Sequence, residues 1–430
     1  MNIIGIIAEY NPFHNGHLYM MEKIRAQFPD SVLIIIMSGS FCQRGEIAVL
    51  DKWTRAALAI NGGADIVFEL PFAFASRSGE FFAKGAVSIL DRLNIVDMLA
   101  FGSEYSDLNY LLKIANSIDD TSIQEKIHNE TAKGASYAAA LTEALEENFD
   151  ESANILRSPN AILAISYLRA IKKINSKIEP LIIERKSVGH NDLISIGSFA
   201  SATAVREELA KTNPDYSLLQ KILPPKTFEA VKNPNLLYSH EKLFAPLAVK
   251  LYTTPIEKLQ GIYGVNEGLE NRILNAVKTS ASIAEVIEKT SSKRYSKSRI
   301  NRTATHILTD FTKEAAKKID EADELYARLM AFNEKGARIL GSIKEKSFIP
   351  IVEKTSRFIT EGDLRKNPAN LSPLQLSLFY DIRGTFLQCV AKNSFENPAK
   401  DFFISPIYIK SRYPSTAFGG PPPLSGEAQK

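Results

Sequence analysis

Strand-length apolar runs recur through the first half of the chain, separated by segments with helical spacing. Asp51 to Asn61 (DKWTRAALAIN), for example, places apolar residues three and four positions apart, as on one face of a helix. Continuously apolar runs joined by helices are typical of a parallel sheet that is covered on both faces. The strands predicted from these runs are Ile3–Ala8, Ser31–Met37, Ala64–Leu70, Ile95–Phe101 and Ile178–Glu184.

The second half of the chain has a mainly helical pattern. Pro214 and the pair Pro224-Pro225 mark the change between the halves. Beyond them, the spacing predicts a helix over Glu314 to Leu329, whereas Phe348 to Val352 fits either a strand or a connector. We therefore predict an α/β fold with a Rossmann-like parallel-sheet domain over residues 1–212 and a mainly helical domain over 213–413. The Pro-, Gly- and Ser-rich residues 414–430 are expected to form a disordered tail.

Composition narrows the class of protein. The net charge of the 430 residues is only +3, so any nucleic-acid surface must be local. Cys42 and Cys389 are far apart, which fits a reducing compartment and no disulfide framework. The first residues lack a basic stretch with a cleavage site, and no apolar run approaches the length of a membrane span. We expect a soluble cytoplasmic protein without membrane contact.

The most informative motif, His14-Asn15-Gly16-His17, stands between the first predicted strand and the helix after it. A helix N-terminus offers unpaired backbone N–H groups and a partial positive charge, which attract phosphate. Gly16 lets the backbone approach a ligand closely. His14 and His17 add donors that can follow the charge developing on a leaving pyrophosphate. We interpret the loop as a nucleoside-triphosphate site.

A metal site and a chance match are the alternatives for these two histidines. Zinc normally needs three or four ligands, and His128, His190, His240 and His306 are scattered along the chain, so we assign no metal. The chain has neither a GxxxxGK[ST] nor a GxGxxG motif, so the nucleotide is not held in either of those ways.

Further candidates follow other predicted strands, where open parallel sheets bind their ligands. Gly102 can admit an adenine or a ribose, or it is an ordinary turn glycine. Asn160, just after Pro159, either supports a helix start or reads a ribose or base edge. Arg185 and Lys186 end a strand that should be central, and they either bind an anion or are solvated.

Ser201 to Thr203 open another predicted helix. Hydroxyls at this position ordinarily cap the helix. The alternative is a second phosphate clamp, in which Arg206 reaches the same anion as the histidines.

A basic run without any acid spans ten residues of the helical half, and its cations are Lys293, Arg294, Lys297, Arg299 and Arg302. At helical spacing Arg294, Lys297 and Asn301 share a face, and Tyr295 can stack on a base. The run is either a solvated basic face or an RNA-binding surface.

Together these residues resemble a known family. The block from Ala8 to His17 (AEYNPFHNGH) looks like the HxGH signature of the nucleotidyltransferase superfamily. With Ser38 to Phe41 (SGSF) and Asp51 to Arg55 (DKWTR), it resembles the bacterial tRNA(Met) cytidine acetate ligases. The resemblance continues at Lys293 to Tyr295 (KRY) and at Phe332 to Gly336 (FNEKG).

The resemblance implies a nucleotidyltransferase-like ATP-binding domain followed by a tRNA-binding domain. It implies that ATP and acetate give acetyl-adenylate and pyrophosphate. The acetyl group then moves to N4 of the wobble cytidine of elongator tRNA(Met), forming N4-acetylcytidine. The expected partners are therefore elongator tRNA(Met), acetate and ATP, with Mg²⁺ accompanying the ATP.

The resemblance also implies site residues by position. His14 and His17 would be catalytic, Arg206 a possible phosphate clamp, and the five cations of the basic run would contact RNA. The implied ATP site comprises Ile7, Ala8, Glu9, Tyr10, Asn11, Pro12, Phe13, His14, Asn15, Gly16, His17, Leu18, Tyr19, Met20, Gly102, Asn160, Arg185 and Lys186.

Two other functions stay open. One is a nucleotidyltransferase that joins AMP to a small phosphorylated substrate, although a small acceptor needs no large helical half with a basic run. The other is an RNA-binding protein whose nucleotide fold no longer catalyses. The intact His14, Gly16, His17 and Arg206 speak against it.

Overall fold

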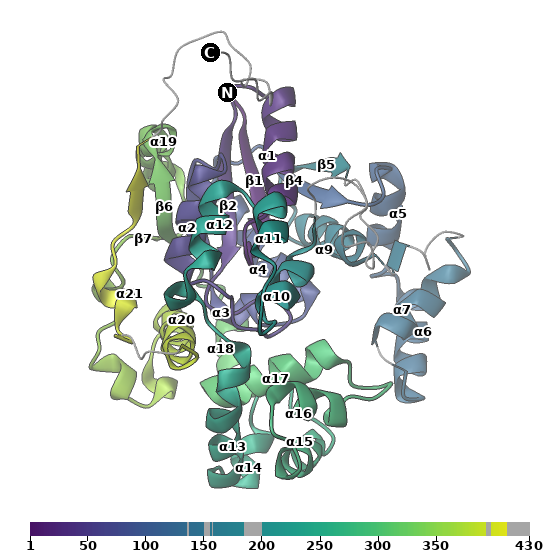
Figure 1. Ribbon diagram of the computed structural model, residues 1–430. Helices are drawn as coiled ribbons and strands as arrows, with labels where there is room; N and C mark the ends of the chain where they lie inside the picture. Colours follow the sequence, from purple (N-terminus) through teal and green to yellow (C-terminus); the bar gives the residue numbers. More distant parts are fainter. Residues whose placement is uncertain (136, 150–154, 157, 185–199, 393–396, 411–430) are drawn as a thin grey trace.

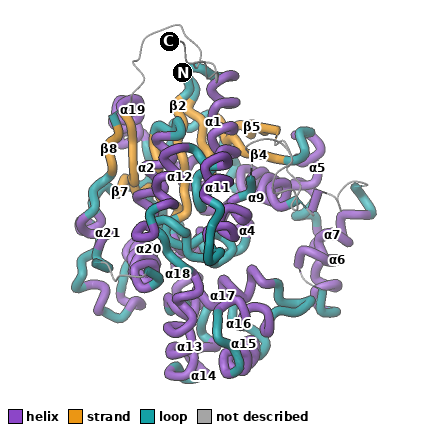
Figure 2. Tube along the Cα trace, in the orientation of Figure 1, coloured by secondary structure: helices purple, strands orange, loops and turns teal. Residues whose placement is uncertain are grey.

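The computed structural model describes residues 1–135, 137–149, 155–156, 158–184, 200–392 and 397–410. One sheet runs through their centre (Figure 2). Its strands are β1 (Ile3–Ala8), β2 (Val32–Ser38), β3 (Ile66–Leu70), β4 (Met98–Ser103), β5 (Glu179–Glu184), β6 (Ala327–Asn333), β7 (Ile351–Val352) and β8 (Ile407–Ile409). They follow the order β5-β4-β1-β2-β3-β6-β7, and β8 pairs with β6.

The first five strands pair in parallel, which confirms the predicted α/β class. All five predicted strands are present, with their starts shifted by up to three residues. The prediction that the fifth strand is central is wrong. Among the described strands β5 pairs only with β4, and its residues are mostly half-buried or exposed. The flanking glutamates Glu179 and Glu184 suit such an edge, because a charged residue there stays in water.

Helices cover the sheet and extend beyond it (Figure 1). In the first half they are α1 (Asn15–Gln27), α2 (Lys52–Asn61), α3 (Phe72–Ala75), α4 (Gly79–Arg92), α5 (Leu108–Ser117), α6 (Thr121–Ala132), α7 (Tyr137–Glu146), α9 (Pro159–Lys173) and α10 (Ala202–Leu209). In the second half they are α11 (Tyr216–Ile222), α12 (Pro225–Lys232), α13 (Phe244–Thr253), α14 (Ile256–Gln260), α15 (Leu269–Lys278), α16 (Ile283–Thr290), α17 (Lys297–Thr309), α18 (Lys313–Ala322), α19 (Glu334–Lys346), α20 (Pro373–Val390) and α21 (Lys400–Phe403). Short 3-10 turns lie at Pro234–Leu236, His240–Leu243, Thr355–Arg357, Asp363–Arg365 and Pro368–Asn370.

Strand β2 shows why its apolar run is continuous. Alternate residues of a strand point to opposite faces, and both faces of this sheet are covered. Ile34 and Ile36 belong to one buried cluster, which includes residues of α4, whereas Leu33 and Ile35 belong to the other, which includes residues of α1 and α2. The run is apolar throughout because each face of β2 packs against a different buried cluster.

The second half of the chain is mainly helical, as predicted. Helices α13 to α17 gather in one lobe at the bottom of Figure 1. The helix predicted over Glu314 to Leu329 is wrong beyond Ala322, because α18 ends there and Asp323 adopts a left-handed φ of 52°. Of the stretch from Phe348 to Val352, only the last two residues form a strand.

Strands from the second half continue the sheet of the first. Strand β6 pairs with β3 in antiparallel orientation and carries both β7 and β8. The division at residue 212 stays a prediction, and the predicted tail lies outside the described residues. No helix of the described residues has the length and apolar character that a membrane crossing requires.

Candidate active site

The two motif histidines cap helix α1. His14 is the N-cap residue, with extended backbone, and its Nδ1 accepts a hydrogen bond from Gly16 N at 3.0 Å. His17 reaches back, and its Nδ1 accepts from His14 N at 3.2 Å. This reciprocal pair is a capping box built from imidazoles. A Cβ at Gly16 would come within 2.9 Å of the His14 ring, so the glycine makes room for this ring.

The capping bonds fix the tautomer of both rings. A neutral imidazole whose Nδ1 accepts a hydrogen bond carries its proton on Nε2. The rings of His14 and His17 stack with their centroids 3.7 Å apart. Two N–H groups of the helix start therefore donate to the rings, and each ring presents an Nε2–H donor of its own. This arrangement suits an anionic ligand with several oxygens.

Aromatic side chains pack the loop that precedes the motif. Tyr10 and Phe13 are buried, and the Tyr10 ring makes edge contacts with the rings of Phe13 and His17. Asn11 Oδ1 accepts from Val49 N at 2.8 Å. Arg206 Nη1 donates to Asn11 O at 3.1 Å, so this cation already contacts the loop that the histidines follow.

Arg55 ties the ends of β1 and β2 together. Its fully buried guanidinium donates to Glu9 O at 2.6 Å and to Ser38 O at 3.0 Å, and it also donates to Gly39 O. Its Nε donates to Leu50 O at 3.1 Å. All these acceptors are main-chain carbonyls, so Arg55 holds the backbone on which the site is built.

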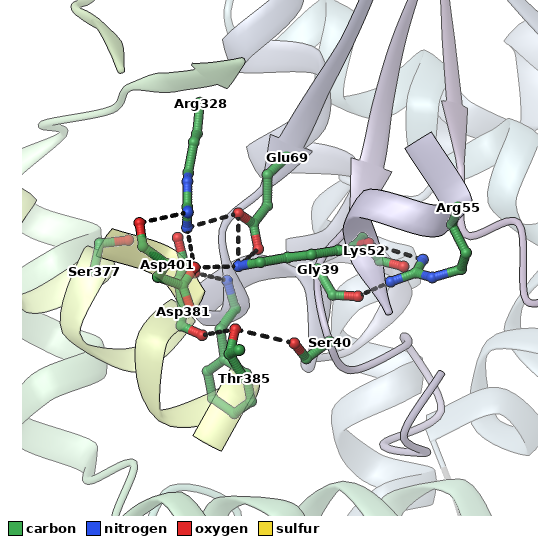
Figure 3. Close-up of polar contacts among 12 residues, drawn as sticks. Gly39, Ser40, Lys52, Arg55, Glu69, Arg328, Ser377, Asp381, Thr385 and Asp401 are labelled. Atoms are coloured by element: carbon green, nitrogen blue, oxygen red, sulfur yellow. Dashed lines mark hydrogen bonds and ion pairs between the residues drawn. The ribbon is translucent and has the colours of Figure 1, made fainter. Parts of the chain in front are cut away.

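Beside Gly39 lies a buried network of charges (Figure 3). Lys52 Nζ is 2.7 Å from Glu69 Oε1 and 2.7 Å from Asp401 Oδ1. Arg328 Nη1 is 3.1 Å from Glu69 Oε2 and also pairs with Asp401. A Cβ at Gly39 would overlap with the Glu69 carboxylate. The network joins α2 and β3 of the first half to β6 and α21 of the second.

A further buried carboxyl group, Asp381 on α20, borders this network. It accepts from Phe72 N at 2.7 Å and from the Tyr326 hydroxyl. Burial, reinforced by the Glu69 carboxylate, raises the pKa of Asp381 to about 8, although Lys52 opposes the shift. A protonated Asp381 leaves two cations opposite two carboxylates in the network, so the buried charges balance.

This pKa predicts how stability depends on pH. Because the folded pKa lies above the ordinary value of 3.8, folding takes up a proton between the two values. The stabilising contribution is complete below the ordinary value and is lost as pH rises through the folded value. We expect the free energy of unfolding of the wild type, relative to Asp381→Asn, to fall between about pH 4 and about pH 8. Chemical denaturation of both proteins measures this difference, and a difference that does not change with pH would contradict the assignment.

The other predicted site residues are placed as follows. Gly102 lies in β4, where it pairs with Ile183 of β5. Asn160 lies in the first turn of α9 behind Pro159, and its Nδ2 donates to Glu104 Oε1 at 2.5 Å. Arg185 and Lys186 lie outside the described residues.

Ser201 is the N-cap of α10, as the capping interpretation predicts, and accepts from Ala204 N at 3.1 Å. Arg206 lies in the same helix and pairs with Glu46 Oε2 at 3.1 Å. The carboxylate and a phosphate would compete for the same guanidinium.

The basic run does not form a single helical face as predicted. Helix α17 begins only at Lys297, so Arg294 lies before it, and Asn301 is buried. The prediction that Tyr295 stacks on a base is also wrong, because its ring is 5% exposed and its hydroxyl donates to Glu267 at 3.1 Å.

The cations of the run differ in their surroundings. Arg294 pairs with Glu267 at 2.7 Å, and Lys297 pairs with Glu288 at 2.5 Å. Arg299 lies over the Tyr295 ring at 4.7 Å, and Lys293 is exposed and makes no ion pair with any described residue.

Lys52 and Arg55 received no role in the sequence analysis beyond the DKWTR block. One signal could have found them, since helical spacing places both on the buried face of α2 with Ala56 and Ala59. A charged residue on a buried face needs polar partners. The partners of Lys52, which are Glu69 and Asp401, are distant in sequence and could not be inferred. Within the described part of the chain, no three His, Cys, Asp or Glu side chains gather as a metal site.

Comparison with known proteins gives the class of this fold and site. The model of the family described as HIGH Nucleotidyl Transferase matches residues 1–401. A tRNA(Met) cytidine acetate ligase of Thermoanaerobacter sp. (strain X514) is 38% identical over 369 residues, 83% of this chain and 90% of that protein. The one of Clostridium novyi (strain NT) is 35% identical and covers 95% of this chain and 100% of its own length. The chain belongs to the tRNA(Met) cytidine acetate ligase family.

Solved structures agree with this membership. The crystal structure of Thermotoga maritima TmcAL bound with alpha-thio ATP is similar with a TM-score of 0.84 and 32% identity, over 96% of this chain and 100% of that one. Its apo form is similar with a TM-score of 0.86 and 31% identity over the same shares.

Proposed function

We propose that this chain activates acetate with ATP and acetylates N4 of the wobble cytidine of elongator tRNA(Met). The observation that carries the proposal is the capping box in which Nδ1 of both His14 and His17 accepts a hydrogen bond at the start of α1, in a chain of this family. In a neutral ring this bond assigns the proton to Nε2, which can donate to a phosphate. The relative from Thermotoga maritima, which was solved bound with alpha-thio ATP, supports ATP as the nucleotide.

In the first step an acetate oxygen attacks the α-phosphorus of ATP, and the bond to pyrophosphate breaks. His14 and His17 donate from Nε2 to phosphate oxygens, and these bonds strengthen as charge builds on the leaving group. Arg206 turns from Glu46 toward the same phosphates. The proposed ATP-binding residues are the loop from Ile7 to Met20, Gly102, Asn160, Arg185 and Lys186.

In the second step N4 of cytidine attacks the acetyl carbonyl carbon. The new C–N bond forms, the bond to the adenylate oxygen breaks, AMP leaves, and N4 gives up one proton. The adenylate is already activated, so this step needs no protein nucleophile. It does need an unstacked cytosine in a site with little water.

Mg²⁺ is expected to enter with ATP. This ion is commonly held by substrate phosphates and water rather than by a dedicated protein cage.

Exchange of pyrophosphate into ATP tests the first step. We expect exchange that depends on acetate, measured with purified protein with and without bulk tRNA. A stable dinucleotide formed with a small phosphorylated acceptor would instead indicate the small-substrate nucleotidyltransferase. Binding of tRNA without exchange or acetylation would indicate an RNA-binding protein.

The basic run supplies a second test. We expect Lys293→Ala with Arg299→Ala to weaken tRNA binding and to lower the slope of log K against log salt by about two, because each lost phosphate contact removes about 0.9. Filter binding at several salt concentrations measures the slope. Arg338→Ala is the control, because Arg338 lies on the distant helix α19 and pairs with Glu334. An unchanged slope in the double variant would show that tRNA binds to another surface of the protein.

A further inference from the structure

A hairpin after β2, residues 40–48, connects the candidate ATP loop with the basic run. Phe41 and Ile47 form an antiparallel bridge. Within it, Cys42 N donates to Glu46 O and Gly45 N donates to Cys42 O, both at 2.9 Å. Gly45 has a φ of 82°, a conformation that favours glycine. We call residues 42–45 the hairpin tip.

Helix α17 holds the tip on one side. Arg44 O accepts from Asn301 Nδ2 at 3.0 Å, and Gly45 O accepts from Thr305 Oγ1 at 2.6 Å. A Cβ at Gly45 would come within 2.5 Å of Arg302 N, so the tip and the helix backbone are in direct contact. The tip therefore has a fixed position relative to the basic run at the start of α17.

The candidate ATP loop holds the tip on the other side. Gln43 N donates to Glu9 Oε1 at 2.5 Å, and Glu9 follows β1 directly. Burial raises the pKa of Glu9, while the bond from Gln43 and the charges of Arg206 and Arg44 lower it. The positive charge of Arg44 therefore favours the ionised form of the Glu9 carboxyl group.

Arg44 itself is exposed at this tip and makes no ion pair with any described residue. It differs in this from Arg294 and Lys297 of the basic run, which are both paired with glutamates. Because the backbone of the tip is held from two sides, binding of a phosphate by this guanidinium needs to order only the Arg44 side chain and not the loop.

We propose that Arg44 is a further tRNA-binding residue, which contacts a backbone phosphate where the RNA passes from the basic run to the ATP site. The inference rests on the proposed function. It extends the RNA surface across the junction between the two halves of the chain. A contact at the tip would place the acceptor cytidine beside the loop that holds the acetyl-adenylate.

Salt-dependent tRNA binding of Arg44→Ala and Arg44→Lys tests this inference. We expect Arg44→Ala to weaken tRNA binding about fivefold to tenfold and to lower the salt slope by about one. Arg44→Lys keeps the charge and should keep the slope. The KM for tRNA in the acetylation reaction should rise with the dissociation constant in Arg44→Ala. The drop in tRNA affinity should exceed any change in acetate-dependent exchange.

Arg365→Ala is the matched control, since Arg365 is also exposed and makes no ion pair with any described residue, and it lies in a distant 3-10 turn. The same affinity and slope in Arg44→Ala as in Arg365→Ala would overturn the inference. That result would leave the proposed function intact as long as the wild type acetylates tRNA. Failure of the wild type to acetylate tRNA would overturn the proposed function itself.

Discussion

His14→Asn and His17→Glu each lower the rate of acetyl-adenylate formation by about 100-fold or more, as expected for loss of a donor that acts in the transition state. The variants are chosen to preserve the helix start. Asparagine is a good N-cap residue and can accept from Gly16 N, and glutamate at the third helical position completes a capping box. Asparagine is too short to place an N–H donor where the imidazole Nε2 lies, and glutamate carries no N–H group.

Acetate-dependent pyrophosphate exchange, together with thermal unfolding of each variant, measures this effect. His128→Gln is the control, because His128 lies exposed on α6. We expect all three variants to unfold near the wild-type temperature. Exchange at a near-normal rate in both loop variants would show that the histidines only cap the helix.

Asp401→Asn should lower the free energy of unfolding by about 3–5 kcal/mol, the usual cost of breaking a buried ion pair from one side. The substitution keeps the volume of the side chain, so no cavity forms. It leaves Lys52 and Arg328 with Glu69 as their remaining carboxylate, because Asp381 is protonated near neutral pH. An excess positive charge then stays buried between the two halves of the chain.

Urea denaturation measures the loss. Glu321→Gln is the control, since Glu321 forms a well-exposed pair with Lys317, and such pairs contribute little. A midpoint for Asp401→Asn close to that of Glu321→Gln would mean that the network does not stabilise the junction.

The fold could be predicted where the pattern is local and continuous. The strands β1 and β2 are buried on both faces, so their sequences are continuously apolar. Such a run can be recognised as a strand without knowing its position in the sheet. The order of the strands is not local, and β5 was misplaced for that reason. Only the start of β6, from Ala327 to Leu329, falls within the helix predicted over Glu314 to Leu329, because it directly follows a true helical repeat. Its burial comes from β3, which is more than 250 residues earlier in the chain.

In the candidate site, too, the local features could be predicted from the sequence and the contacts between distant residues could not. His14 to His17 form one turn of chain, so the sequence indicates both the loop and its chemistry. Arg55 acts through four main-chain carbonyls that carry no side-chain signature. Asp401 meets Lys52 across 349 positions of sequence, and the hairpin tip meets Asn301 across 257. Only the folded chain brings these residues together.

The central claim is tested most directly by following labelled acetate into tRNA. Purified protein is incubated with ATP, carbon-13 acetate and tRNA(Met), and the tRNA is digested to nucleosides for mass analysis. We predict labelled N4-acetylcytidine at the wobble position, with one AMP and one pyrophosphate formed for each acetyl group transferred. Unlabelled tRNA, recovered while a relative from the same family acetylates it under the same conditions, would contradict the account.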